Sequence, residues 1–294
     1  MKKGTAKSLV YRLFIGLVIL VGMGLLAYPS VSNWYNDVHR TRAIADYREV
    51  ATSMSRVDLD AMRLKAHEYN ESLRHKTDRF RPTDAELADY MRTLDVTGTG
   101  IMGYIEIPCI DVELPVYHTV EETVLQIAAG HMPGSSLPIG ETGSHVVLSG
   151  HRGLPSARLF THLDKVQVGD KFLMHVLDET FTYEVYDIDI VLPEEMDSLS
   201  IKSDGDLVTL VTCTPYGVNS HRILVHGERV PNDAVPEDGA DIKHEDNADS
   251  HDYGYRFDIK DDFGLVLIAV FLVLMAGRSA ADIIRKSKKC KKQD

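Results

Sequence analysis

The chain has few cysteines and aromatic residues, and its long central part has few basic ones. Only three of its 294 residues are cysteine and one is tryptophan, too little cysteine for a disulfide framework. The two ends are basic, with four Lys or Arg and no acid in residues 1–12, and seven against two acids in residues 278–294. Of the 32 basic and 44 acidic residues, 21 and 42 remain between these ends. Such an acidic middle is a poor candidate for nucleic-acid binding.

Charge is also missing from Leu13–Tyr28, an apolar run near the N-terminus. It is short for a membrane span, which takes about 20 residues, unless its neighbours are recruited. A cleaved signal peptide is the alternative, because a basic flank precedes the run. Against cleavage, Tyr28-Pro29-Ser30 lacks small residues at alternating positions, and Trp34 and Tyr35 stand where interfacial aromatics belong. A retained span is the favoured interpretation.

A second apolar run, Phe263–Gly277, is followed by a basic segment at residues 285–292. It has the length of a buried core helix, but the basic flank favours a second span, with both termini cytoplasmic and the acidic middle extracellular. The sequence thus predicts, in order, a basic tail, a transmembrane helix, an extracellular helical region, a catalytic β-domain, an acidic disordered linker, a transmembrane helix and a basic tail, at residues 1–12, 13–30, 31–100, 101–230, 231–260, 261–278 and 279–294.

The hydrophobic pattern changes period within the extracellular part. Helical spacing predicts helices over residues 34–54, over 57–73 after a Ser55 N-cap, and over 82–94. Short strands separated by turn residues follow and predict a β-barrel or sandwich; they are expected at residues 103–107, 114–117, 146–149, 171–176, 181–191, 207–212 and 223–226. In the linker, His244 and His251 lie among acids, but nothing ordered would fix them as a metal site.

Three side chains suggest acyl transfer through a thioester. Cys213 ends one expected strand, Arg222 opens the next, and His151 follows a third. Each has an ordinary alternative: a small buried hydrophobe, a solvated cation and a loop residue. Of the other cysteines, Cys109 is interpreted as core packing and Cys290 as an incidental cytoplasmic thiol.

The sequence around these residues resembles the sortase family. Thr209–Arg222, TLVTCTPYGVNSHR, is similar to the sortase signature TLxTC…R, and LSGHRG at 148–153 to its histidine motif. The segments 103–119 and 157–172 continue a likeness that covers roughly Val31–Arg229. The resemblance implies a mainly β fold, an eight-stranded sortase barrel with short inserted helices, for which 125–129 and 157–163 are the candidates.

The resemblance also implies roles for individual residues. Cys213 is then the nucleophile, His151 the general acid and base, and Arg222 the group that steadies substrate and oxyanion, with Thr212 in support. No Asp or Asn partner for His151 is evident, and neither a cofactor nor a metal is implied. The rival bases are His118, His131, His145, His162 and His221.

The two spans, the helical N-terminal region and TCTPYGxNxHR resemble class C, the pilin-polymerising sortases of Gram-positive bacteria. These join an LPxTG-like sorting signal to a lysine of the next pilin subunit, so the implied partners are pilins and the membrane. Many carry a lid with an Asp-Pro-aromatic motif, to which Asp78-Arg79-Phe80 corresponds with arginine in place of proline. Asp78 is expected to pair with Arg222, and Phe80 to cover Cys213.

Two alternatives remain open. A sortase that anchors surface proteins or finished pili to peptidoglycan would share the site but use a cross-bridge amine as acceptor. A membrane-tethered binding or scaffold protein with an inactive site is the non-enzymatic alternative, and Cys213, His151 and Arg222 together argue against it.

Overall fold

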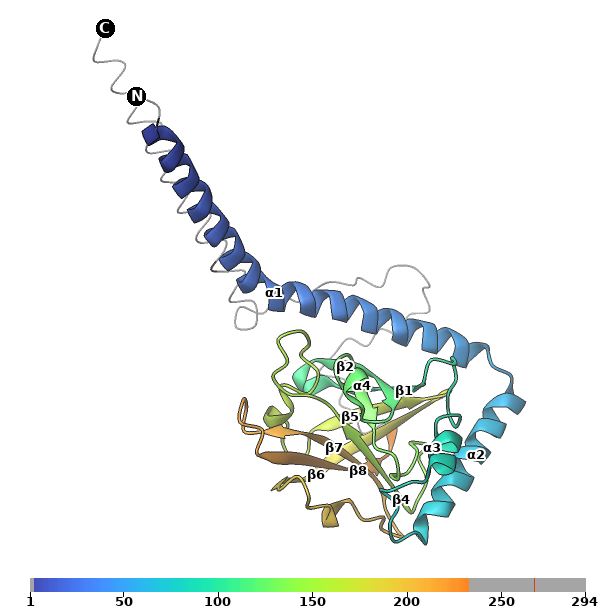
Figure 1. Cartoon of the computed structure of the whole chain (residues 1–294). Helices are drawn as coiled ribbons and strands as arrows, with labels where there is room; N and C mark the ends of the chain where they lie inside the picture. Colours follow the sequence, from blue (N-terminus) through green and yellow to red (C-terminus); the bar gives the residue numbers. More distant parts are fainter. Residues whose placement is uncertain (1–2, 233–266, 268–294) are drawn as a thin grey trace. The chain divides into compact units, whose positions relative to one another are not determined.

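A computed structural model describes residues 3–232 and residue 267 (Figure 1). The described residues belong to two units, divided between Tyr35 and Asn36, which are considered separately. Apart from residues 231, 232 and 267, the acidic linker, the second expected span and the C-terminal tail lie outside the described part of the chain. The predictions made for them, the possible metal ligands His244 and His251 included, stay predictions.

The first expected span and the helix after it form one helix, α1, Lys3–Ser53, with Pro29 inside it. Within the described residues, the stretch Phe14–Ser53 is the one helix long and apolar enough to cross a membrane. Most apolar side chains between Phe14 and Tyr35 are exposed, as expected of a surface that faces lipid. The structure therefore agrees with an N-terminal anchor and differs from the expected break between two helices.

The later part of α1 packs on the β-domain through one face. Ile44, Tyr47 and Ala51 are buried together with Ile101 and Tyr104. The Tyr47 hydroxyl donates to the carbonyl of residue 102 at 3.0 Å and accepts from the N–H of residue 177 at 2.8 Å. Because both of these partners belong to the β-domain, Tyr47 fastens the helix to it.

Two further helices, α2 (Arg56–Arg74) and α3 (Asp84–Tyr90), precede the strands. The expected Ser55 N-cap is present and accepts from the N–H of Asp58 at 3.2 Å. Leu59 and Ala66 of α2 are buried, whereas Leu64 is exposed. Leu64 is five residues beyond Leu59, which at 3.6 residues per turn turns it away from the packed face.

The β-domain is a closed eight-stranded barrel in the order β1-β2-β3-β4-β7-β8-β6-β5. Its strands are β1 Ile101–Ile107, β2 Val112–His118, β3 Ala129–His131, β4 Ser144–Ser149, β5 Lys171–Val176, β6 Glu179–Val191, β7 Asp206–Thr214 and β8 His221–Val230. The mainly β barrel implied by the resemblance is confirmed. Strand β3 was not expected, because three residues are too few to show a period-two pattern.

Both expected inserted helices are wrong in position. The first, α4, spans Glu122–Leu125 and ends before residues 125–129 are complete, because Ala129 already belongs to β3. In the second stretch, Ala157 forms an isolated bridge with Leu154, and only a 3-10 turn at Leu163–Lys165 follows. An apolar run this short cannot be assigned to helix or strand by periodicity alone.

The strands that carry the site have two apolar faces. Val208, Leu210, Ile223 and Val225 point into the barrel core. The alternate residues Val211 and Leu224 form a second, outer cluster together with Val147 and Leu199. Side chains alternate across a strand, so β7 and β8 are buried on both sides along most of their length. Such strands read as continuous apolar runs, as these do in the sequence.

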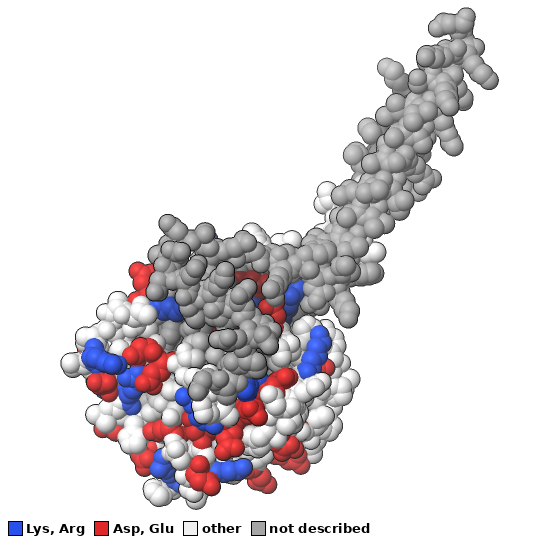
Figure 2. Space-filling view, turned by 180° about the vertical axis from the view of Figure 1, so that it is seen from behind, with Lys and Arg blue, Asp and Glu red and all other residues white. Residues whose placement is uncertain are grey.

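Acidic side chains are spread over the visible face of the β-domain, with lysine and arginine between them (Figure 2). Cys109 lies on the surface rather than in the core, a correction to the sequence interpretation. It belongs to a 3-10 turn, Pro108–Ile110, that follows β1 and leaves the residue exposed. Both Cys109 and Cys213 are free thiols, so no disulfide blocks Cys213.

Two buried histidines and one buried aspartate make the stability depend on pH. Burial lowers the pKa of His131 to about 3 and that of His145 to about 4, from an ordinary value of 6.5. Burial raises the pKa of Asp206 from 3.8 to about 6. Between the shifted and ordinary values, the unfolded chain binds more protons at the histidines, and the folded chain more at the aspartate. Acidification therefore weakens the fold through the histidines, and Asp206 opposes this change.

We expect the unfolding free energy of residues 36–253 to fall by about 3 kcal/mol between pH 7 and pH 4.5, because two destabilising histidines outweigh one stabilising aspartate. Urea unfolding at the two pH values measures the difference. Asp206→Asn removes the opposing contribution, so its loss should be about 2 kcal/mol larger than that of the parent. Equal stability of the parent at both pH values would contradict the linkage.

Candidate functional site

Cys213 and Arg222 are brought together by strand register. Strands β7 and β8 pair antiparallel, and Cys213 stands directly opposite Arg222 in that ladder. Directly paired residues on one face have Cβ atoms about 5 Å apart. The cation is therefore a cross-strand neighbour of the thiol, one pair before Thr214 and His221 end the ladder.

His151 is placed beside Cys213 by the other neighbour of β7. Strand β4 runs parallel to β7 and pairs Ser149 with Val211. The register continues past the end of β4, because the N–H of Gly150 donates to the carbonyl of Val211 at 3.0 Å. Two residues beyond this last pair, His151 comes level with Cys213. The three predicted residues thus lie at the ends of three adjacent strands, β4, β7 and β8.

Thr212 supports this arrangement from inside the barrel. Its side chain is buried, and its hydroxyl donates to the carbonyl of Gly150 at 2.7 Å. Because Thr212 precedes Cys213 and Gly150 precedes His151, one hydrogen bond joins the two segments that carry thiol and imidazole. The Thr212 side chain therefore lies inside the barrel and makes a structural hydrogen bond.

His151 has an acidic partner that the sequence did not reveal. The imidazole Nε2 lies 3.1 Å and 3.3 Å from the two carboxylate oxygens of Glu122, in the first turn of α4. Hydrogen bonds from Gln126 and then His151 lower the pKa of Glu122, so its carboxylate is ionised at neutral pH. An ionised carboxylate accepts and does not donate, so the Nε2 atom of His151 carries a proton.

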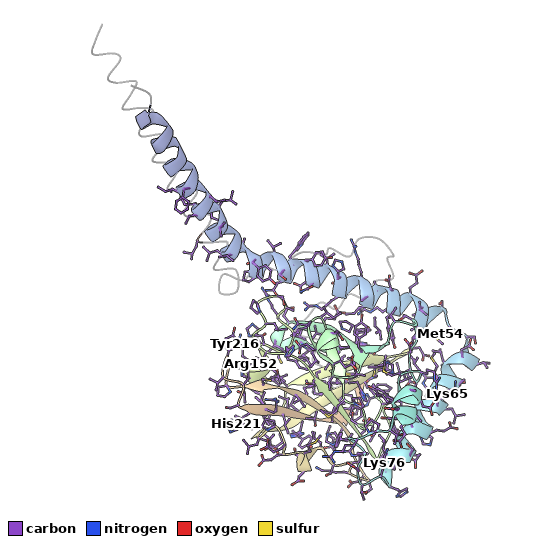
Figure 3. All side chains as sticks on the ribbon, viewed as in Figure 1. Met54, Lys65, Lys76, Arg152, Tyr216 and His221 are labelled. Carbon is purple, nitrogen blue, oxygen red and sulfur yellow. The ribbon has the colours of Figure 1, made fainter. Side chains whose placement is uncertain are left out.

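Arg152 ties the histidine loop to the strand of the thiol. Its guanidinium donates to the hydroxyl of Thr214 at 3.1 Å and to Asp164 at 2.6 Å, and it lies over the ring of Tyr216. Figure 3 shows Arg152 and Tyr216 close together at one end of the β-domain. The Arg152 side chain is only 8% exposed. Because Arg152 follows His151 and Thr214 follows Cys213, their hydrogen bond joins the two segments. The place of Arg152 next to His151 in sequence was the signal that could have identified it.

The side chain of Arg222 is half-buried and forms no ion pair with a carboxylate of the described residues. Its Nη1 donates to the carbonyls of Asn219 at 3.2 Å and His221 at 3.0 Å. These bonds hold the base of the guanidinium against the β7–β8 loop. A guanidinium has five donors, so several remain for a substrate carbonyl or oxyanion.

Most of the rival histidines are used structurally. His118 contacts the carbonyls of Gly100 and Thr93, His131 contacts Tyr90 and Ser136, and His145 contacts Ser200 and Thr209. These three are buried, away from solvent and substrate. His221 pairs with Thr214, one step from Arg222 and so on the opposite face, and His162 precedes the 3-10 turn of residues 163–165.

The segment Asp78-Arg79-Phe80 lies on the outer apolar cluster next to the thiol. Phe80 packs against the cluster that contains Val211, which shares a strand face with Cys213 two residues on. Arg79 is buried and donates to the carbonyls of Gly134, at 3.0 Å, and Leu199, with its guanidinium 4.3 Å from the Phe80 ring centre. Asp78 forms no ion pair with Arg222 among the described residues, so the expected pairing is absent.

Gly134 explains how closely this segment is held. Its φ is +86°, and a Cβ atom there would lie 1.9 Å from the carbonyl oxygen of Arg79. Only glycine permits both the conformation and the approach. The segment is therefore fastened to the β3–β4 loop by backbone contact as well as by the guanidinium.

The site combines a thiol, an imidazole and a permanent cation, the groups required for acyl transfer through a thioester. The described residues contain no cluster of His, Cys, Asp or Glu able to hold a metal ion. The three side chains singled out from the sequence, Cys213, His151 and Arg222, lie at the ends of adjacent strands. Sequence reasoning missed Glu122, since a lone acidic pair after a strand carries no distinctive pattern.

Comparisons with known proteins agree with this geometry. A family model described as the sortase domain matches residues 105–230. Sortase C1 from Streptococcus agalactiae is 49% identical with a TM-score of 0.62, over 65% of this chain and 99% of that structure. Sortase C-1 from Streptococcus pneumoniae is 41% identical with a TM-score of 0.58, over 65% and 98%.

A more distant curated relative is sortase D of Bacillus subtilis, 28% identical over 131 residues. That match covers 44% of this chain and 63% of the relative, so the chain spans less than two thirds of the length of this curated protein. The solved structures, by contrast, are covered almost completely, helices and barrel alike. The chain belongs to the sortase family, and within that family it is a class C sortase.

Proposed function

We propose that the protein is a membrane-anchored cysteine transpeptidase that cleaves an LPxTG-like sorting signal and joins the acyl group to a lysine of a pilin subunit. The observation that carries the proposal is the strand register that sets Cys213 opposite Arg222, with His151 level with Cys213 on the other side. Catalysis by these residues is part of the proposal, as are the extracellular position of the β-domain and the two cytoplasmic termini.

In the first half-reaction, the Cys213 thiolate attacks the scissile carbonyl and a C–S bond forms. Arg222 stabilises the negative charge on the carbonyl oxygen, because it presents a permanent cation where that charge develops. His151 gives a proton to the leaving amine as the C–N bond breaks. The products are a thioester on Cys213 and a free amine.

In the second half-reaction, an acceptor ammonium ion first loses one proton to solvent and the neutral amine attacks the thioester. The new C–N bond forms as the C–S bond breaks, the sulfur leaves as the Cys213 thiolate, and the second amine proton passes to His151. The enzyme returns to its starting state with one isopeptide bond formed. Water in place of the amine gives hydrolysis.

The acceptor separates this proposal from its alternative. A pilin lysine gives polymerisation, whereas a peptidoglycan cross-bridge amine gives wall anchoring of surface proteins or finished pili. Two of the similar solved structures favour a pilin lysine as the acceptor. One is described as a sortase of a pilus island, and the other was studied for its pilin substrate specificity. An inactive scaffold is disfavoured, because the three reactive side chains are assembled together.

Mass spectrometry of the full chain in detergent with an LPxTG peptide tests the chemistry. We expect an acyl adduct on Cys213 that is absent from Cys213→Ala, and its conversion to an isopeptide when a lysine-bearing pilin domain is added. Conversion only by glycine-type amines would establish wall anchoring instead. Absence of the adduct from both the parent chain and the lid variant Arg79→Ala, described below, would contradict the proposed transpeptidase activity.

The proposal includes a lid, the segment Asp78-Arg79-Phe80. Phe80 lies on the apolar cluster that continues the strand face of Cys213, so a substrate lying along this face would meet it. Arg79 stands where related lids carry proline, and its two hydrogen bonds to carbonyls hold the segment down. Arginine therefore fastens this lid through side-chain bonds, where proline would act by stiffening the backbone.

Loss of the Arg79 bonds should open the lid. We expect Arg79→Ala to raise the rate of Cys213 alkylation by iodoacetamide about ten-fold, because hydrogen bonds made by a charged group contribute about 1.5–3 kcal/mol. Arg81→Ala, an exposed arginine two residues on, is the matched control and should react like the parent. Equal rates for both variants would show that Arg79 does not restrain the lid.

A further inference from the structure

The rim of the barrel orders four side chains by charge and chemistry. Strands β3, β4, β7 and β8 are consecutive neighbours. Helix α4, which precedes β3, contributes Glu122; His151 follows β4, Cys213 ends β7 and Arg222 opens β8. An anion and a cation thus stand at opposite ends of the row, with the imidazole and the thiol between them.

The place of Glu122 in this row is set by backbone packing. Leu125 of α4 lies against Gly130 in the middle of β3, where a Cβ atom would meet Leu125 at 3.1 Å and the carbonyl oxygen of Thr119 at 2.3 Å. Gly130 pairs with Ser149, the last residue of β4. The helix therefore lies next to the end of the strand that leads into His151.

The Glu122 carboxylate has capacity for another donor. Its side chain is 67% exposed; Gln126 donates to one of its oxygens, and His151 contacts both. A carboxylate offers about four lone-pair sites. The helix brings no basic side chain to this end, since Glu121 comes before Glu122 and Thr123 after it.

The two halves of the reaction make different electrostatic demands. The scissile carbonyl develops negative charge and requires the cationic end of the row. The acceptor arrives as an ammonium ion, since a lysine side chain has a pKa of about 10.4, and it must reach His151 without meeting Arg222. A carboxylate on the side of His151 away from Arg222 meets that demand. It attracts the acceptor ammonium ion, while Arg222 attracts the carbonyl oxygen of the sorting signal, so the two substrates bind at separate ends of the site.

We propose that Glu122 is the binding residue for the acceptor ammonium ion, which it holds beside His151 on the side away from Arg222. The inference rests on the proposed transpeptidase and specifies its acceptor side: a primary amine that is cationic when it binds. Glu122 remains ionised throughout and takes no proton, while His151 carries out the proton transfer.

The test uses the full chain in detergent with one LPxTG peptide, and it compares a cationic acceptor with an uncharged one. Nα-acetyl-lysine amide is cationic near neutral pH, whereas hydroxylamine is uncharged. The ratio of kcat/KM for the lysine derivative to that for hydroxylamine isolates the contribution of charge. In Glu122→Gln, we expect this ratio to fall about five-fold, as is typical of one partly exposed ion pair.

Glu121→Gln is the matched control, because it removes the same charge from the neighbouring exposed position, which makes no side-chain cap bond. It should keep the ratio of the parent. If Glu122 acted only by orienting His151, Glu122→Gln would slow both acceptors alike. An unchanged ratio, or an equal fall in both variants, would overturn the inference alone. Loss of both products in the parent chain would overturn the proposed function and, with it, this inference.

Discussion

The pairing of β7 with a parallel strand on one side and an antiparallel strand on the other is the constraint on which the site depends. The antiparallel ladder sets Cys213 opposite Arg222, and the parallel ladder brings His151 level with Cys213. A slip of one residue in either ladder would turn a required side chain to the other face. Burial on both faces resists such a slip, because Val208 and Leu210 would leave the core as Val211 entered it.

The alternation of inward and outward side chains along β7 separates structural residues from the free thiol. Thr212 faces inward and bonds to the carbonyl of Gly150, while its neighbour Cys213 is free on the outer face. Arg152 adds a second link between the same two segments through Thr214. Two hydrogen bonds thus join the segments that carry the imidazole and the thiol without using either group. The sequence neighbours of His151 and Cys213 make these structural bonds.

Charge along the rim gives the site a direction. Arg222 at one end suits the carbonyl that accumulates negative charge, and Glu122 at the other suits an incoming cation. The segment Asp78-Arg79-Phe80 lies on the outer cluster and is held by Arg79 through carbonyls of two separate loops. This segment connects α2 to α3, whereas Glu122 belongs to α4, so the aromatic ring and the carboxylate come from different elements.

The sequence by itself determined the fold class, the apolar N-terminal helix and the Ser55 cap, and it singled out Cys213, His151 and Arg222 as candidate reactive residues. Each of these has a local signal: an apolar run, a capping residue, or a short motif at a strand end. It misplaced the two inserted helices, missed β3 and buried Cys109, because segments of three to seven residues show no reliable period. Only the tertiary structure decided that Glu122 meets His151, that Arg79 fastens its own segment to Gly134 and Leu199, and that Asp78 forms no ion pair with Arg222 among the described residues. The contacts that do form join residues 29 to 120 positions apart, and local sequence carries no record of which distant elements a closed barrel brings side by side.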